Sequence, residues 1–447
     1  MTRRRTTELG LFLLVVLIIT GAYVLVGLGQ EASLPAGIGP FLLLIMGLLL
    51  VAHLAIRRLA PQADGTLLPV AALLNGIGYV FIARLDDQLA ANQAVWTLLG
   101  IGVFAATLAI VRDAADLSRY MWTFALAGLG LLLLPLLPVI GLTINTARLW
   151  IQVGPVNFQP GELAKIALTI FLAAYLVENR EVLAMGSHRL GPIQIPDLRH
   201  LAPVVVAWAG SLVVMIAERD LGSSLLLFAT FIVMLWVATS RIAYVVVGAL
   251  LFAIGAFVSW SLFDHVQLRV DIWLDPWQDP FGDGFQLVQS TFGMAGGGLF
   301  GTGPGQGRPD LIPLPETDFI FAAITEELGL LGGTALLAAY LLIMGTGLRT
   351  AVRSTDPFST LLAAGLTFVV GFQAFVIVGG VLRLVPLTGI TLPFVSYGGS
   401  SLVANYILLA ILVRISDQVN GRADAMADAP AGPGTVEGVR GPRVPVP

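Results

Sequence analysis

Long hydrophobic runs, separated by short polar segments, recur along most of this 447-residue chain. Many of these runs are close to the roughly 20 residues that an α-helix needs to cross a bilayer. We therefore predict an all-α, polytopic integral membrane protein with about twelve transmembrane helices. The predicted spans are 9–29, 38–57, 67–83, 92–111, 121–141, 160–177, 201–217, 222–238, 242–262, 319–348, 358–383 and 391–415.

Composition supports a membrane location. Hydrophobic residues make up 57% of the chain, charged residues only 12%, and the mean hydropathy is +0.88. Soluble domains carry about 25% charged residues. The absence of cysteine excludes disulfides and thiolate metal sites, and nothing in the net charge of −4 indicates nucleic-acid binding. Residues 418–447 are rich in Ala, Gly, Pro and Asp, a composition that predicts a disordered cytoplasmic tail.

The distribution of arginine predicts the orientation in the membrane. An even number of spans places both termini on one side. If that side is cytoplasmic, the inner segments hold 17 arginines and the outer segments hold six. Inner segments of membrane proteins carry the excess of positive charge, so we predict that both termini are cytoplasmic. The first span follows three arginines but is too long for a signal peptide, which indicates an uncleaved anchor.

Lys165 is the only lysine of the chain, and it lies inside a predicted span three residues after Glu162. At this spacing the two side chains share a helical face and can pair. Charged groups within a membrane are costly unless they are paired or line a wet cavity, so such positions are candidate functional sites. An ion pair that only pins one helix to its neighbours is the alternative interpretation.

Residues 264–318 form a long, acidic segment on the predicted outer side. Four aspartates recur at every fourth position, at 271, 275, 279 and 283. The prolines and glycines of DPWQDPFGDG make a continuous helix through them improbable and favour turns. We expect Trp277 and Phe281 to bury their rings and hold the aspartates in place. Loops of this length are usually functional when they are ordered.

Other polar positions close to the spans have alternative interpretations. The glycines of GTGPGQG (301–307) resemble a phosphate-binding motif, but no strand precedes them, so tight turns and close backbone packing are favoured. Ser400 and Ser401 fit either a close helix interface or a site. Glu326 and Glu327 lie within an apolar run and require a partner or a cavity.

Four stretches, in this order, resemble one family of membrane proteins. They are NTARLWIQVGPVNFQPGELAKIAL (145–168), ERDLGSSLLLF (218–228), LDPWQDPFGDGFQLVQS with the following LPETDFIFAAITEELGLLG (within 274–332), and PLTGITLPFVSYGGSSL (386–402). The resemblance is to the SEDS family (shape, elongation, division and sporulation) and covers about 67–415. It implies a ten-helix core, here residues 61–417, with two additional helices in residues 1–60 and a large outer loop at 264–318.

The resemblance also implies an activity and a set of site residues. SEDS proteins are peptidoglycan glycosyltransferases that polymerise lipid II at the outer face of the bacterial cytoplasmic membrane. The family's essential aspartate falls on Asp279 as the catalytic residue. Residues implied to bind substrate are Arg148, Trp150, Gln159, Glu162, Lys165, Arg219, Arg269, Gln286, Asp318, Glu326 and Ser400. The chain departs from the family at Gly161, where a serine is usual, and in PETDFIF, which lacks the usual histidine.

Polymerisation of an α-linked lipid diphosphate into β-1,4 glycan inverts the anomeric carbon. Direct displacement with inversion needs a base for the incoming hydroxyl and stabilisation of the departing diphosphate. Asp279 is the candidate base. Arginine or Lys165 can balance the diphosphate, with a divalent cation such as Mg or Mn as a further expectation.

The family resemblance implies a partner, a class B penicillin-binding protein that supplies the transpeptidase, with lipid II and membrane lipid as the other ligands. Two other classes of function remain open. Twelve helices with intramembrane charges also fit a flippase or transporter for a lipid-linked precursor, although no internal repeat is evident. A scaffold that only recruits synthases is the third class. The sequence favours a RodA-like elongation role over a division role only slightly, on Thr388, where some division members carry lysine.

Overall fold

The computed structural model describes residues 3–31, 38–138, 140–144, 147–154, 156–184, 188–190, 193–195, 209–210 and 220–428. Eleven described helices are long and apolar enough to span a membrane. They lie in α1 (Arg3–Glu31), α2 (Ile38–Leu59), α3 (Leu67–Leu85), α4 (Asp87–Ile110), η1 with α5 (Ala114–Tyr120, Met121–Leu133) and η2 (Leu134–Leu136), α6 (Pro160–Glu178), α9 (Leu221–Thr239), α10 (Ile242–Leu262), α13 (Ile320–Arg353), α14 (Pro357–Val381) and α15 (Gly399–Asp428). The predicted span 201–217 lies almost wholly outside the described residues.

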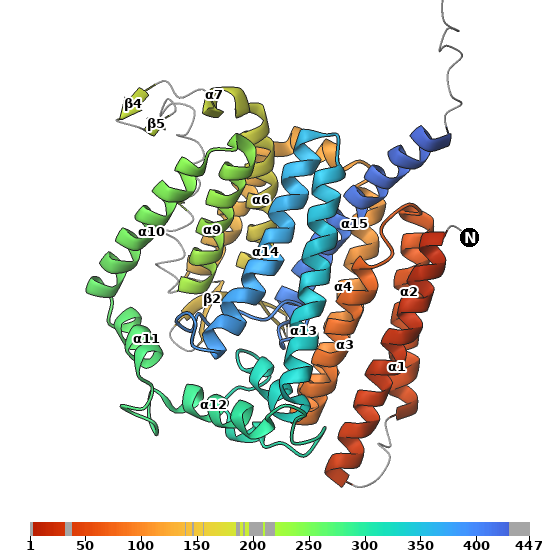
Figure 1. Ribbon diagram of the computed structural model, residues 1–447, viewed down its shortest axis with the longest axis vertical. Helices are drawn as coiled ribbons and strands as arrows, with labels where there is room; N and C mark the ends of the chain where they lie inside the picture. The colour runs from red at the N-terminus through yellow and green to blue at the C-terminus, as the bar shows by residue number, and fades with distance from the viewer. Residues whose placement is uncertain are drawn as a thin grey trace, which may run out of the picture.

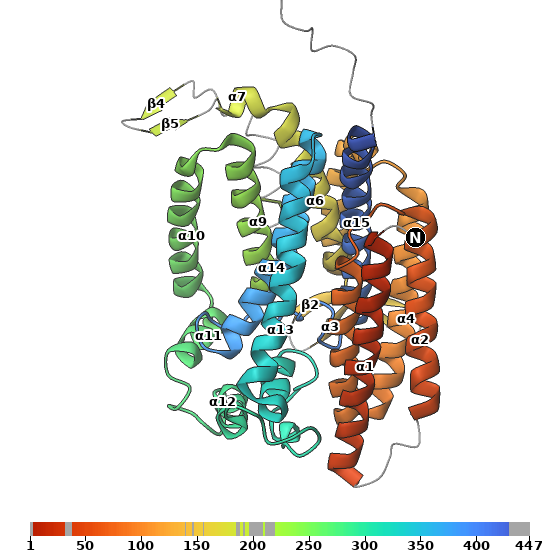
Figure 2. The same cartoon turned by 45° about the vertical axis from the view of Figure 1, so that its right-hand side comes forward.

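The helices form one bundle with a buried centre (Figure 1). Helices α6, α14 and α15 are the most enclosed, and they contact one another as well as α13, α4 and α9. Helix α10 packs on α9 and α11 (Asp264–Leu274), and most of its apolar side chains are exposed, as expected for a helix facing lipid. The start of α1 and the end of α15 lie at the end of the bundle opposite α11 and α12 (Phe285–Gly297) (Figure 2).

Polar side chains at the starts of several helices explain why the helices begin where they do. Asp86 accepts hydrogen bonds from the amides of Gln88 and Leu89, which caps α4. Asp356 accepts from the amide of Ser359 and caps α14. These side chains satisfy amides that have no partner within the helix.

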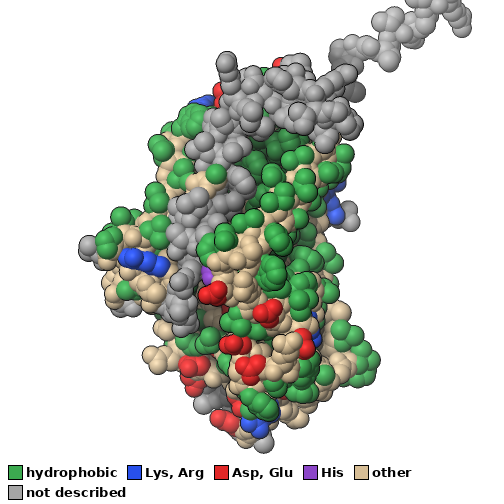
Figure 3. Space-filling view, turned by 90° about the vertical axis from the view of Figure 1, so that its left-hand side faces the viewer, with side chains coloured by type: hydrophobic (Ala, Val, Ile, Leu, Met, Phe, Trp, Pro, Cys, Tyr) green, Lys and Arg blue, Asp and Glu red, His purple; other side chains and the backbone are tan. Residues whose placement is uncertain are grey.

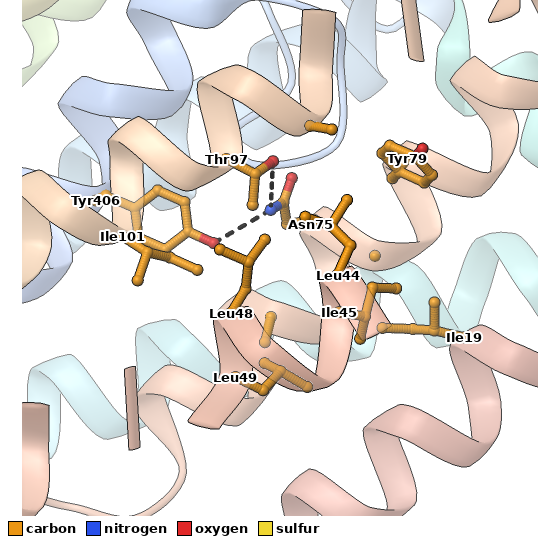
Figure 4. A pocket seen from close by; sticks show the side chains of 13 residues that line it. Ile19, Leu44, Ile45, Leu48, Leu49, Asn75, Tyr79, Thr97, Ile101 and Tyr406 are labelled. Atoms are coloured by element: carbon orange, nitrogen blue, oxygen red, sulfur yellow. Dashed lines mark hydrogen bonds between the residues drawn. The ribbon is translucent and has the colours of Figure 1, made fainter. Parts of the chain in front are cut away.

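The two N-terminal helices pack against α3 and α4 around an apolar pocket (Figure 4). Its wall includes Ile19 from α1 and Leu48 from α2. Asn75 of α3 projects into this region and donates hydrogen bonds to Thr97 of α4 and Tyr406 of α15, both at 3.2 Å. A buried amide that is tied to two other helices fixes how they rotate relative to one another, because leaving it unpaired is costly.

Short strands are an exception to the all-helical expectation. Strands β1 (Gly141–Ile144), β2 (Ala147–Val153) and β3 (Val156–Phe158) form an antiparallel sheet, and β4 (His188–Leu190) pairs with β5 (Ile193–Ile195). The predicted span 121–141 ends early, since α5 stops at Leu133 just before Pro135, which cannot continue the hydrogen-bonding pattern of the helix.

Two further expectations are corrected at the chain's acidic loop and its C-terminal end. Trp277 is 46% exposed and Phe281 is 89% exposed, so neither ring is buried as expected. Trp277 makes an edge-to-face contact with Phe292 of α12 at a ring-centre distance of 5.5 Å. Helix α15 continues to Asp428, so the chain is still helical beyond residue 418, where the tail was predicted to begin. Residues 429–447 lie outside the described part of the chain.

Candidate functional site

The buried lysine lies at the centre of a network of polar side chains. Its amino group is 2.9 Å from the Glu162 carboxylate and donates to the side-chain carbonyl of Gln373 at 3.0 Å. Gln373, on α14, donates in turn to the backbone carbonyl of Thr391 at 2.8 Å. Glu162, Lys165 and Gln373 are all nearly inaccessible to solvent. The two charges are therefore desolvated and paired with each other, and Gln373 adds a hydrogen bond, which is the condition under which buried charges are tolerated.

The start of α15 joins this network. The Ser400 hydroxyl accepts a hydrogen bond of 2.9 Å from the amide of Gln159, which is the N-cap residue of α6. Beside it, the Thr391 hydroxyl donates to Ser401 at 2.8 Å. The structure thus brings Ser400 to Gln159, at the start of the helix that carries Glu162 and Lys165, although Ser400 lies 241 positions further along the chain.

Asp220 is a neighbour that the predicted set did not include. It caps α9, accepting from the amide of Ser223 at 2.9 Å, and it is buried. Burial raises the pKa of the Asp220 carboxyl, and the charge of Lys165 opposes that rise. Asp220, Gln373 and Thr391 belong to this network, but none of them was a predicted site residue. Arg219 lies outside the described residues.

A second group of predicted residues lines a cavity of about 160 Å³ between α11, α12 and the segments that flank α13 and α14. Arg269 comes from α11, Gln286 from α12, and Asp318 lies just before α13. The guanidinium of Arg269 donates to the carbonyl of Leu387 at 2.8 Å. Burial raises the pKa of Asp318 to about 6; the charge of Arg269 lowers it and that of Glu316 raises it further. Cationic, amide and carboxylate groups therefore converge on one cavity.

Asp279 lies in a turn between α11 and α12, outside the cavity wall. Its carboxylate accepts from the amides of Gly282 at 3.0 Å and Asp283 at 3.2 Å. A Cβ at Gly282 would lie 2.2 Å from this carboxylate, so a larger residue there would displace the Asp279 side chain. The next aspartate, Asp283, does line the cavity. The Asp279 carboxylate is thus exposed and held by backbone amides, four residues before the aspartate that lines the cavity.

Acidic side chains gather at this end of the molecule (Figure 3). The exposed carboxylates there include Asp264, Asp271, Asp275, Asp279 and Asp283. Among the described residues, no group of three or more histidines and carboxylates is close enough to hold a metal ion. The carboxylates and histidines of the described residues therefore do not fit a metal held by the protein alone.

The acidic pair in α13 has structural partners. Glu327 pairs with Arg84 of α3 at 2.7 Å and accepts from the amide of Gly305 at 2.7 Å. Glu326 accepts from the amide of Arg308 at 2.7 Å, and its second carboxylate oxygen has no protein partner. Both acids therefore hold the glycine-rich segment 298–308 against α13. This confirms that the glycines serve turns and close packing.

The last two predicted residues lie on the small sheet. Arg148 of β2 is half-buried and donates to the carbonyl of Leu137 at 3.0 Å. Trp150, also on β2, pairs with Leu142 of β1. Among the described residues, no hydrogen bond or ion pair joins either of them to the lysine network or to the outer cavity, so their substrate-binding role stays a prediction.

Comparison with known proteins places these features in a family. The FtsW/RodA/SpoVE family of cell cycle proteins matches residues 80–421. The peptidoglycan glycosyltransferase RodA of Mycobacterium tuberculosis is 48% identical over 92% of this chain and 90% of that protein. The stage V sporulation protein E of Bacillus subtilis is 33% identical over 74% of this chain and 88% of that protein.

Solved structures agree with the sequence comparison. A chain of a peptidoglycan synthase complex that coordinates polymerization and crosslinking superposes with a TM-score of 0.66 at 28% identity, covering 80% of this chain and 98% of that one. The rod shape determining protein RodA of Thermus thermophilus gives a TM-score of 0.55 at 26% identity, covering 79% and 96%. The chain belongs to the FtsW/RodA/SpoVE family.

Proposed function

We propose that this peptidoglycan glycosyltransferase polymerises lipid II at the outer face of the bacterial cytoplasmic membrane. The observation that carries the proposal is the outer cavity, where Arg269, Gln286 and Asp318 converge beside the turn that presents Asp279. The M. tuberculosis relative carries this activity in its name. In this arrangement the lipid tail of the substrate stays in the bilayer while its sugars and diphosphate meet the outer segments.

Asp279 is proposed as the general base. Its carboxylate takes the proton of the incoming 4-hydroxyl as that oxygen forms a bond to the anomeric carbon of the second sugar. The bond from this carbon to the lipid diphosphate breaks on the opposite side, so the configuration inverts. Positioned general bases typically contribute 10²–10⁴-fold to a rate. The amides of Gly282 and Asp283 orient the carboxylate for this role.

Cleavage of the sugar–oxygen bond leaves one additional negative charge on the departing diphosphate, which the protein must balance. Arg269 lines the cavity with a planar guanidinium that suits bidentate binding of phosphate oxygens. Lys165 lies deeper in the bundle than Arg269 and is already paired with Glu162. We propose that its charge contributes to the electrostatic potential at the site without contact to the diphosphate. A divalent cation, if one takes part, would enter with the diphosphate, since the described residues supply no three-ligand cluster.

Reconstitution of the purified protein with lipid II tests the proposal. Wild type should form glycan polymer, whereas Asp279→Asn should stay folded and lose the activity by about 10²–10⁴-fold. Asparagine keeps the shape but cannot accept the proton. Asp271→Asn is the matched control, because the Asp271 side chain is exposed on α11 and makes no hydrogen bond to the turn among the described residues. Near-normal polymerisation by Asp279→Asn would show that another group is the base.

The same preparation distinguishes a lipid-linked precursor flippase. Translocation of labelled lipid II without polymer would favour the flippase, and neither activity would favour a scaffold. The peptidoglycan synthase complex among the structural relatives supports a partner enzyme. We propose a class B penicillin-binding protein, and its identification by co-purification would also separate an elongation role from a division role.

A further inference from the structure

Arg383, just after the end of α14, makes an unusual set of backbone contacts. Its guanidinium donates to the carbonyl of Leu274 at 2.8 Å and to the carbonyl of Trp273 at 3.2 and 3.3 Å. In return, the indole N–H of Trp273 donates to the carbonyl of Arg383 at 3.0 Å. Residues 110 positions apart are thereby joined in both directions.

These contacts cap a helix. Trp273 and Leu274 are the last residues of α11, and the last carbonyls of a helix have no partner within it. A cation at this end also meets the negative end of the helix dipole. Arg269, one turn earlier on α11, donates to the carbonyl of Leu387 in the same segment after α14. Two hydrogen bonds therefore join α11 to residues 383–387, one from Arg269 and one to its last residue, Leu274. Figure 1 shows where α11 lies in the bundle.

The backbone at Arg383 indicates that its side chain is required. Its φ is +58°, in the left-handed region that glycine adopts without strain and other residues rarely adopt. Strained residues of this kind persist only where the surroundings hold them, and they cluster at functional sites. Here the strain accompanies three hydrogen bonds from the guanidinium that glycine could not make.

The position of α11 determines two parts of the proposed site. Trp273, Arg269 and Leu387 all line the outer cavity, so the contacts set one of its walls. The chain leaves α11 at Leu274 and enters the turn that holds Asp279. The position of the C-terminal end of α11 therefore determines where the turn with the candidate base begins.

We propose that Arg383 is a positioning residue for glycosyl transfer, which caps α11 and so holds the Asp279 turn against the outer cavity. This rests on the proposed function of that site. Arg383 does not touch the reacting atoms. Small displacements of a catalytic group by distant substitutions can cost about 10²-fold in rate, so the effect should appear in kcat.

Three substitutions test this in the reconstituted full-length protein with lipid II. Arg383→Gly removes the guanidinium and relieves the backbone strain, so it should melt no lower than wild type yet lose about 10- to 100-fold in kcat with little change in KM. Arg383→Lys retains a cation without the planar fork and should recover part of the rate. Trp273→Phe removes only the indole donor and should cause a smaller loss than Arg383→Gly.

Arg308→Ala is the matched control, because it removes an outer arginine whose side chain, among the described residues, pairs only with exposed Asp310. It should retain the wild-type rate. Wild-type kcat and KM in Arg383→Gly would overturn the proposal, as would a loss of activity that only follows a lower folded fraction. An active Asp279→Asn would instead contradict the proposed function, so the two failures are distinguishable.

Discussion

Lys165 makes two polar contacts that an apolar side chain cannot make, and this predicts the effect of replacing it with methionine. Its compact amino group meets both Glu162 at 2.9 Å and Gln373 at 3.0 Å. Lys165→Met leaves the Glu162 carboxylate buried without a counter-charge, which typically costs about 3–5 kcal/mol. We expect a lower melting temperature in detergent and a loss of lipid II polymerisation.

The double variant Glu162→Gln/Lys165→Met separates the structural role from the functional role. Removal of both charges should restore most of the stability, since replacement of a buried ion pair by neutral residues is often tolerated. We expect its polymerisation to stay low. Recovery of activity together with stability would mean that the pair only fastens α6 within the bundle.

The raised pKa of Asp318 predicts that the protein becomes less stable as pH rises. Its pKa is raised from 3.8 to about 6 in the folded protein, mainly by burial. Between these values the folded state binds more protons than the unfolded state, so the free energy of unfolding falls as pH rises from about 4 to about 6 and the loss is complete above that. Asp318→Asn should remove this contribution.

Melting temperatures of wild type and Asp318→Asn, measured from pH 4 to pH 8, check the prediction. Between pH 4 and pH 6, the melting temperature of the variant should rise relative to that of wild type. Above pH 6 the difference should stay constant. Parallel curves would show that Asp318 does not titrate in this interval.

Individual residues of the site were predictable to different degrees. The Glu162–Lys165 pair followed from the spacing along one helix, because i and i+3 positions share a face. Gln373 and Thr391 lie more than 200 residues further along the chain, and only the packing of α6 against α14 brings them to Lys165. Local pattern contains no information about such a pairing.

Whole elements were predicted best where the hydrophobic run and the helix coincide. The predicted span 160–177 corresponds to α6, whose start at Pro160 is favourable for a first helical position. The predicted span 391–415 began too early, because residues 391–398 form turns and α15 starts only at Gly399. Hydropathy does not distinguish a buried apolar turn from a helix, whereas the hydrogen bonds of the turn do.

The glycine-rich segment beside α13 predicts a contrast between two glycines. Gly301 has a φ of +89°, and a Cβ there would lie 2.1 Å from the carbonyl oxygen of Glu327. Gly301→Ala should therefore cost more than about 1 kcal/mol of stability. Gly296 lies in α12 with nothing within 4 Å of a Cβ, so Gly296→Ala should gain about 0.5–1 kcal/mol.

Thermal unfolding of the two alanine variants in one detergent gives the comparison. Helix α13 kinks at Gly329, and the segment before Gly301 supplies hydrogen-bond acceptors there. The amides of Leu330 and Leu331 donate to the carbonyls of Gly298 and Leu299. A stable Gly301→Ala would mean that this pairing can shift without loss. Equal effects at the two positions would contradict the role assigned to the close approach.

At the scale of the molecule, the candidate site residues lie in two places. The Lys165 network lies inside the bundle among α6, α14 and α15, whereas the cavity with Arg269 and Asp318 lies at the end formed by α11 and α12. Under the proposed function, the outer cavity receives the charged head group of the substrate while the lipid tail stays in the bilayer. The pattern of spans predicted the first location and the acidic loop predicted the second, but the cavity itself depends on how α11 packs on the segment after α14.

The orientation of the whole molecule is the last prediction. The start of α1 and the end of α15 share one end of the bundle, and the acidic outer segments occupy the other (Figure 2). The split of 17 inner and six outer arginines predicts that the shared end is cytoplasmic. Because the chain contains no cysteine, single cysteines can be labelled without background.

Asp310→Cys and Ala423→Cys, both at exposed positions, suit this experiment. In spheroplasts, a membrane-impermeant maleimide should label the cysteine at position 310 and should reach the one at position 423 only after permeabilisation. The reverse pattern would place the acidic segments and the Asp279 turn in the cytoplasm. Polymerisation of lipid II at the outer face would then be impossible, because the base and the outer cavity would lie on the wrong side of the bilayer.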